Sequence, residues 1–213
     1  LSGGVTIYVK DGTYYENIDF KGKAITLRSE NGPENTIIDG NHNGAVITMD
    51  NDENENSILY GFTIRNGENN KGGGIHIDDS SPIIRNCIIE NNTANSNGGG
   101  IYLDRSFALI DSCIIRNNSA KKGGGVFTTD ERGLPIFQNC EFSGNNSTSD
   151  GGGVYVDNMD ATLTQCTFQN NAASDDGGGL YLRKVGTVHI ENGSFISNNS
   201  VDKGGAIYFE DRK

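Results

Sequence analysis

Proline and apolar residues are both scarce in this chain of 213 residues. Only 3 residues are proline, which is typical of a chain whose backbone N–H groups are mostly needed for sheet hydrogen bonds. Hydrophobic residues make up 34%, which suits the thin core of a narrow solenoid. No stretch approaches the apolar length of a membrane span, and residue 1 does not open a signal segment. We therefore expect no membrane insertion, and we expect any export signal or anchor to have been removed or to lie outside this sequence.

Clusters of basic residues are missing as well. The formal net charge is -11, with 17 Lys and Arg against 28 Asp and Glu. Proteins that bind nucleic acid depend on Lys and Arg to neutralise phosphates. Nucleic acid is therefore not an expected partner.

Glycine, in contrast, is abundant and recurs in blocks. Six blocks begin at intervals of 26, 25, 28, 26 and 27 residues. They are Gly72–Gly74, Gly98–Gly100, Gly123–Gly125, Gly151–Gly153, Gly177–Gly179 and Gly204–Gly205. A fixed period of this length indicates one structural unit that is copied and stacked. Because the repeats fill 67–213 without a linker and 1–66 fit less regular coils of the same kind, we predict a single domain over 1–213.

A short strand is expected after each glycine block. The residues alternate with period two, so the aliphatic first and third positions should point inward and the aromatic middle position outward. The middle positions are His76, Tyr102, Phe127, Tyr155, Tyr181 and Tyr208. Stacking of the repeats would place these rings in one column.

Two further strands complete each repeat, joined by a sharp corner. The corner residues are Asn86, Ser112, Asn139, Gln165 and the pair Asn192-Gly193. Asn tolerates the left-handed conformation that such a corner requires. The third strand begins at Cys87, Cys113, Cys140, Cys166 and, in the last copy, Ser194. An Asn follows five residues after each of these positions, at Asn92, Asn118, Asn145, Asn171 and Asn199.

Three strands and three turns in about 26 residues, without helical periodicity, predict an all-β fold. We expect a right-handed parallel β-helix with three strands per coil and about eight coils. Equivalent residues would then stack at ~4.8 Å, so that the Asn side chains form a hydrogen-bonded ladder. The leucine-rich repeat is the nearest alternative, but its return path often uses a helix where this chain supplies glycine and two more strands.

Several motifs resemble known bacterial proteins. Gly204-Gly205-Ala206-Ile207 is similar to the Gly-Gly-Ala-Ile motif of the chlamydial polymorphic outer membrane proteins. The segments 142–145 and 168–171 match the Phe-x-x-Asn motif of the same proteins. The opening, 9–18 and 32–40, resembles the first coils of exported pectin-lyase-like proteins. The resemblance implies a β-helix that is exported or displayed on a bacterial surface, with adhesins and polysaccharide-active enzymes as the main functions of its relatives.

The four cysteines should lie in one inward column. Stacked Cβ atoms at the coil spacing are too far apart for ordinary disulfide geometry, and an axial column cannot surround a tetrahedral metal ion. We therefore interpret the column as a buried ladder of free thiols that act as small apolar side chains.

The aromatic column is the first candidate for a binding site. Aromatic faces flanked by Asp and Arg suit an extended glycan or a partner protein, such as a host or cell-surface protein. The alternative interpretation is that the stacked rings only stabilise a sheet face.

Catalytic and metal sites are weaker candidates in the sequence. Asp78, Asp79, Asp104 and Arg105 could meet on adjacent coils, as a polysaccharide lyase or an inverting glycosidase would require. Asp150 and Asp176 could bind calcium. Carboxylates in solvated turns are the simpler interpretation of both groups.

These observations together favour an extracellular or cell-surface bacterial β-helix, which serves as a rigid stalk or as an adhesin-type binding surface. The alternative is a polysaccharide-binding lyase or glycoside hydrolase that uses the face with the aromatic column. No cofactor is expected apart from the calcium just mentioned. Since the last coil in the sequence is incomplete, end-to-end self-association through uncapped coils is a further expectation.

Overall fold

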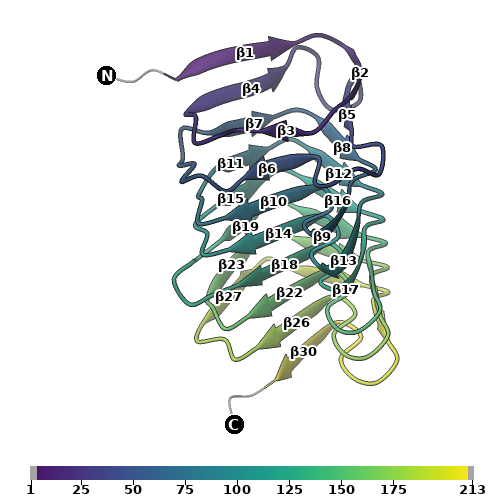
Figure 1. Cartoon of the computed structure of the whole chain (residues 1–213). Coiled ribbons are helices and arrows are strands. Elements are labelled where there is room, and N and C mark those ends of the chain that lie inside the picture. The colour runs from purple at the N-terminus through teal and green to yellow at the C-terminus, as the bar shows by residue number, and fades with distance from the viewer. Residues whose placement is uncertain (1–3, 211–213) are drawn as a thin grey trace.

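Each coil of the chain lies on the one before it, and eight coils form the stack in Figure 1. The computed structural model describes residues 4–210, and every regular element in that range is a strand. Neighbouring strands pair in parallel, each with the equivalent strand of the next coil. The predicted all-β parallel solenoid of about eight coils is therefore confirmed.

Three sheets of eight strands form the sides of the stack, and we number them in the order in which a coil visits them. Sheet 1 contains β1 (Val5–Val9), β4 (Ile25–Ser29), β7 (Ile58–Tyr60), β11 (Ile83–Arg85), β15 (Leu109–Asp111), β19 (Ile136–Gln138), β23 (Ala161–Thr164) and β27 (Val188–Glu191). Sheet 2 contains β2 (Gly12–Tyr15), β5 (Thr36–Asp39), β8 (Thr63–Arg65), β12 (Ile88–Glu90), β16 (Ile114–Arg116), β20 (Glu141–Ser143), β24 (Thr167–Gln169) and β28 (Ser194–Ile196). Sheet 3 contains β3 (Ile18–Asp19), β6 (Ile47–Met49), β10 (Ile75–Asp78), β14 (Ile101–Asp104), β18 (Val126–Thr129), β22 (Val154–Asp157), β26 (Leu180–Arg183) and β30 (Ile207–Glu210). The strand predicted after each glycine block belongs to sheet 3.

A fourth, six-stranded sheet was not anticipated by the sequence pattern. Sheet 4 contains β9 (Glu68–Lys71), β13 (Thr93–Asn97), β17 (Ser119–Lys122), β21 (Asn146–Ser147), β25 (Ala172–Ala173) and β29 (Asn199–Ser200). Its strands lie between sheet 2 and sheet 3 along the chain, immediately before the glycine blocks. The prediction of three strands per coil therefore describes only the first two coils, and the later coils contain four. These strands are short and mostly polar, apart from the two alanines of β25, so they carry no apolar alternation that would have revealed them.

The corners between sheet 1 and sheet 2 have the backbone conformation that the sequence predicts. Asn86, Ser112, Asn139, Gln165 and Asn192 all have φ between 52° and 54°. This left-handed region is sparsely populated by residues other than glycine, and Asn is enriched there. In the last copy the corner consists of Asn192 alone, so Gly193 occupies the position after the corner, which is cysteine in the other copies.

The core is a thin column of side chains from the inner faces of sheets 1, 2 and 3. Ile84 from β11, Ile89 from β12 and Ile75 from β10 are each completely buried in it. The next coil contributes Ile110, Ile115 and Ile101 at the same places. Burial of a Leu or Ile side chain contributes about 1.5–3 kcal/mol, and here the same contribution is repeated coil by coil.

The cysteines lie at the start of sheet 2, and they are all free and buried. Ser194 does not continue their column. Since Ser194 pairs with Thr167 in β24, the residue stacked on Cys166 is Gly193. The assignment of Ser194 to this column is therefore wrong, because the corner before it takes Asn192 alone rather than both Asn192 and Gly193.

A column of buried Asn side chains follows sheet 2. The Oδ1 atom of Asn118 accepts hydrogen bonds from the backbone N–H and from Nδ2 of Asn92, both at 3.0 Å. Its own Nδ2 donates to the carbonyl of Ile89 at 2.9 Å. The same pattern continues through Asn145 and Asn171.

The last member of this column is Asn198 and not Asn199. Asn171 donates from Nδ2 to Oδ1 of Asn198 at 2.9 Å, while Asn199 is an exposed residue of β29. The assignment of Asn199 is wrong for the same reason as that of Ser194. The spacing of five residues was counted from Ser194, whereas the residue equivalent to the cysteines is Gly193, and five residues after Gly193 comes Asn198.

Replacement of Asn145 by Ala tests how much this column stabilises the fold. The change removes the acceptor of two hydrogen bonds from Asn118 and the donor to the carbonyl of Ile115. Because each buried polar group left unsatisfied costs about 1–3 kcal/mol, the free energy of unfolding should fall by roughly 3 kcal/mol or more. The exposed neighbour Asn146 provides the control. Asn146→Ala should change the free energy of unfolding by about 0.5 kcal/mol or less. Urea denaturation measures both, and equal effects would contradict a stabilising column.

Candidate functional site

The predicted aromatic column exists, but most of it is buried. Rings on the outer face of sheet 3 stack coil on coil, with centroids 5.8 Å apart for Tyr102 and Phe127 and 4.5 Å apart for Tyr155 and Tyr181. Tyr102, Phe127, Tyr155 and Tyr181 are exposed by only 2%, 4%, 1% and 5%. Together they form an apolar cluster separate from the main core. The rings do point away from the core, as predicted, but the burial of these four leaves little of their surface for a ligand.

The glycine blocks and the ends of sheet 4 cover the rings. A Cβ atom built on Gly151 would lie 2.8 Å from the Cβ of Tyr155, and a Cβ built on Gly177 would lie 2.8 Å from the Cβ of Tyr181. Figure 1 shows β9, β13 and β17 beside the strands of sheet 3. Nζ of Lys71 donates to the Tyr102 hydroxyl at 2.9 Å and lies 4.7 Å from the ring centroid. A glycan therefore has no access to the ring faces of the central coils, and only the partly exposed His76 and Tyr208 at the two ends are less covered.

Carboxylates gather instead where sheet 3 ends and the chain turns into sheet 1. We call this edge of the stack the acidic corner. Its members are Asp50, Asp52, Glu53, Asp78, Asp79, Asp104, Asp130, Glu131, Asp157 and Asp160. Strand pairing places Asp78 beside Asp104 on the next coil, and Asp157 beside Arg183. The edge thus runs along the stack with at least one carboxylate on most coils.

The four predicted catalytic candidates do meet at this corner. The guanidinium of Arg105 donates to Asp78 and Asp79 of the preceding coil and lies 3.2 Å from Oδ1 of Asp104. The hydrogen bond from Arg105 lowers the pKa of Asp79. Burial, opposed by Arg105 and reinforced by Asp78, raises the pKa of Asp104. Asp104 is therefore easier to protonate than an ordinary Asp. Arg105 lies beside it and balances the charges of Asp78 and Asp79.

Tyr102 connects this cluster to the buried rings. Its hydroxyl donates to Oδ2 of Asp104 at 3.2 Å and accepts from Lys71. Burial and the charge of Asp104 raise the pKa of the Tyr102 hydroxyl, so it stays protonated as a donor at neutral pH. Asp130 forms a separate pair with Arg132, whose hydrogen bonds lower the pKa of Asp130 to about 2.

Glu53 is a buried member of the corner that sequence analysis missed. It is 2% exposed, and its carboxylate accepts from the N–H of Gly22 at 2.7 Å, the N–H of Asn51 at 2.9 Å and the hydroxyl of Ser80 at 2.9 Å. It thus fastens three consecutive coils together. The run of polar residues around it gave no signal of burial, because Glu is rarely buried unless it is paired.

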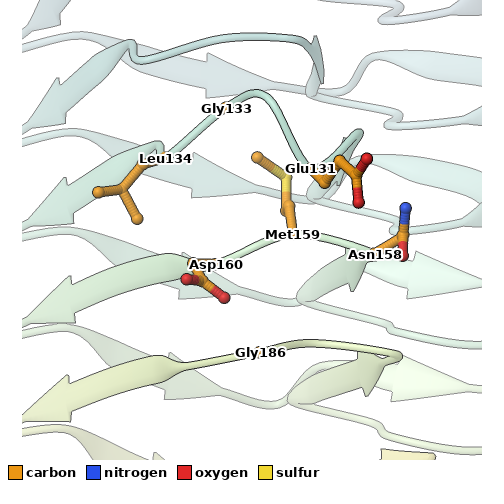
Figure 2. Close-up of a pocket in the computed structure, with 7 residues that line it drawn as sticks. All are labelled: Glu131, Gly133, Leu134, Asn158, Met159, Asp160 and Gly186. Carbon is orange, nitrogen blue, oxygen red and sulfur yellow. The ribbon is translucent and has the colours of Figure 1, made fainter. Parts of the chain in front are cut away.

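A cavity of about 280 Å³ was also missed. It lies at the C-terminal part of the acidic corner and is lined by Glu131, Gly133, Leu134, Asn158, Met159, Asp160 and Gly186 (Figure 2). The turn over 130–135 forms one wall of it. Only the length of this turn, compared with those of the other copies, marks the place in the sequence.

The two calcium candidates, Asp150 and Asp176, lie close to each other. The N–H of Asp176 points to Oδ1 of Asp150 at 3.4 Å, and Asp150 lies 3.8 Å from Nζ of Lys122. Within residues 4–210 no group of three or more His, Cys, Asp or Glu side chains is arranged to hold a metal ion. In the same range no helix is long and apolar enough to cross a bilayer.

Comparisons with known proteins agree with this architecture. The model of a family described as "Right handed beta helix region" matches residues 61–213. The comparison with curated proteins gives no match. Among solved structures, a pectin methylesterase in complex with a hexasaccharide is similar, with a TM-score of 0.55 and 12% identity. The similarity covers 99% of this chain and 74% of that one, and at this identity it concerns the fold alone.

The pH dependence of stability tests the role of Glu53. Burial raises the pKa of Glu53, but the hydrogen bonds from Asn51, Gly22 and Ser80 outweigh burial and leave it below the usual 4.5. A carboxyl with a lowered folded-state pKa stabilises the fold above its unfolded-state pKa, and this contribution is lost as the pH falls through the folded value. Glu53→Gln should therefore be less stable than the parent by about 1–3 kcal/mol at pH 7, and the difference should shrink below about pH 4.5.

Urea denaturation between pH 7 and pH 3 measures this difference. Glu34→Gln, at an exposed position, is the control and should follow the parent chain throughout. A gap between Glu53→Gln and the parent that stays constant over this range would show that Glu53 acts through packing and not through its charge.

Proposed function

Because this chain belongs to the right-handed β-helix family, we propose that it is a rigid extracellular element of a bacterial surface whose acidic corner binds a partner. The observation that carries the proposal is the unbroken parallel register of sheets 1, 2 and 3 over all eight coils. A rod with this register resists bending, since every coil is hydrogen-bonded to the next along several sides. Such a rod suits a stalk that holds a binding edge away from a cell.

The acidic corner is the edge best suited to binding. Its carboxylates belong to turns, and turns on a rigid scaffold commonly carry binding residues. Asp50, Asp52 and Asp79 are exposed or partly exposed. The net charge of -11 favours partners with positive charge and disfavours nucleic acid. The carboxylates of the corner can also accept hydrogen bonds from a hydroxyl-rich surface. A glycan or a cell-surface protein fits this description.

Binding at the corner should depend on its carboxylates. Asp52 and Asp79 have φ of 61° and 47°, a backbone conformation that Asn accepts, and Asp79→Asn keeps an oxygen that can accept the hydrogen bond from Arg105. Asp50→Asn, Asp52→Asn and Asp79→Asn can therefore be combined, with circular dichroism to check that the triple variant is folded. We expect the chain to retain ligands from a panel of neutral and cationic glycans and extracellular proteins, and the triple variant to retain them at least several-fold less. Salt should weaken the binding, because the Debye length is about 10 Å at 0.1 M.

The matched control removes three carboxylates elsewhere, with Glu16→Gln, Glu34→Gln and Asp202→Asn. All three positions are exposed and lie outside the acidic corner. Equal retention by the two triple variants would contradict a binding role of the corner. Loss of retention by the control alone would place the binding edge elsewhere on the rod.

A carbohydrate-active enzyme is the second candidate function. The similar pectin methylesterase was solved with a hexasaccharide, and the raised pKa of Asp104 is a property that a general acid needs. The contacts of Arg105 with all three neighbouring carboxylates keep them paired, which disfavours a role for them in acid–base catalysis. The binding role is therefore the better supported of the two.

An activity assay separates the two candidates. The chain would be incubated with methylated pectin and with polygalacturonate, with and without calcium, and the products examined for methanol, reducing ends and unsaturated ends. We expect none of these above the level of the variant Asp104→Asn. Product formation that Asp104→Asn abolishes would establish the enzyme and displace the stalk as the main function.

A further inference from the structure

The cavity at the acidic corner lies where one turn is longer than the equivalent turns of the two neighbouring coils. Six residues, 130–135, connect β18 to β19, whereas 158–160 connect β22 to β23 on the next coil. The extra length is folded back by hydrogen bonds from the N–H groups of Arg132 and Gly133 to Asp130. Figure 2 shows this turn above Met159, with Asn158 and Asp160 on the following turn and Gly186 on the turn after that. The overhang and the two turns below it line the cavity, which opens to solvent.

A second compartment of about 220 Å³ adjoins the first. It is lined by Leu134, Asp160, Ala161, Thr162, Thr187 and His189, so Leu134 and Asp160 belong to both compartments. Each compartment is smaller than the roughly 300 Å³ at which pockets for drug-sized ligands begin. Two adjoining compartments of this size suit two consecutive ring-sized units of one ligand.

The groups that line the compartments are suited to hydroxyl-rich rings. Leu134, which is 39% exposed, offers an apolar surface between the compartments. Thr162, Thr187 and Asn158 supply hydroxyl and amide groups for hydrogen bonds. The N–H of Thr187 donates to Oδ1 of Asp160 at 2.6 Å and fixes this carboxylate in place. A sugar ring has both an apolar C–H face and a hydroxylated edge, which these groups can accommodate together.

Charge narrows the class of sugar. Of the residues lining the two compartments, all within the described part of the chain, Glu131 and Asp160 are acidic and none is Lys or Arg. Uronic acids would be repelled by these carboxylates and by the net charge of -11. A protonated amine would instead form charge-assisted hydrogen bonds with them.

We propose that these two compartments bind two consecutive units of an amine-bearing saccharide, such as a 2-amino-2-deoxyhexose oligomer. Leu134 contacts the C–H face of the rings, and Glu131 and Asp160 pair with the amines. The inference rests on the proposed binding role and names the place on the acidic corner and the class of ligand. A basic peptide is a poorer fit, because an extended backbone would not use two separate, ring-sized compartments.

Titration with oligomers of two to four glucosamine units, followed by calorimetry and by backbone amide shifts, tests the proposal. We expect binding to the parent chain, with shifts concentrated at 131–134, 158–162 and 186–189. The double variant Glu131→Gln and Asp160→Asn should bind at least about tenfold more weakly. The control, Glu16→Gln with Glu34→Gln, should bind like the parent. If the double variant does not fold, Glu131→Gln alone serves, because Glu131 is exposed.

Three results would overturn the proposal. One is equal affinity for the parent chain and the folded double variant, which would place any glucosamine site outside the cavity and leave the acidic corner as a binding edge. Another is equal or tighter binding of galacturonate oligomers, which would remove the argument from charge. The third is binding of a lysine-rich peptide, with the same shifted amides, in the absence of glucosamine binding. If neither saccharides nor peptides bind anywhere on the chain, the proposed binding role fails as well.

Discussion

Hydrogen bonding between successive coils is the constraint from which the rest of this structure follows. A parallel ladder pairs each residue with its equivalent one coil away, at ~4.8 Å, so the same kind of environment is imposed at the same position of every coil. Ile75 and Ile101 are paired in this way, and so are Ile89 and Ile115. A residue type that suits one coil therefore suits them all, and this is the physical origin of the repeat in the sequence.

The same constraint makes a buried polar column possible. A single buried Asn would need several partners from its own coil, but in the stack each Asn receives them from the coils on either side. Asn118 accepts from Asn92, donates to Ile89 and in turn donates from its N–H to Asn145. Glycine is required close to this column, because a Cβ at Gly74 would come within 2.8 Å of Nδ2 of Asn92. The glycine blocks and the Asn positions are thus two parts of one arrangement, which explains why they recur together.

The sequence was sufficient for the fold and insufficient for the surface. Alternation and spacing predicted the three main sheets, the eight coils and the left-handed corners at Asn86 and Gln165, because those features repeat. The predicted register was wrong only where either of two adjacent residues could fill the same position, as with Asn198 and Asn199. Coverage of the rings by sheet 4 could not be predicted, since β21 and β25 are only two residues long and neither shows an apolar alternation. Exposure depends on how loops fold over a face, and the period of the repeat contains no information about that.

Departures from the repeat are therefore the places where a solenoid can acquire a specific function. The long turn 130–135 leaves the core unaffected, because Ile136 and Phe137 return to register with Leu109 and Ile110 on the preceding coil. An insertion at a turn thus changes the surface at small cost, since the entropy of closing a loop grows only slowly with its length. Within the repeat, in contrast, the stacked environment restricts each position to residues that fit every coil. Binding chemistry that needs unlike groups side by side, such as a carboxylate, an amide and an exposed leucine, has to arise where one coil differs from its neighbours. The turn between β18 and β19 meets this condition, and the acidic corner supplies the charge around it.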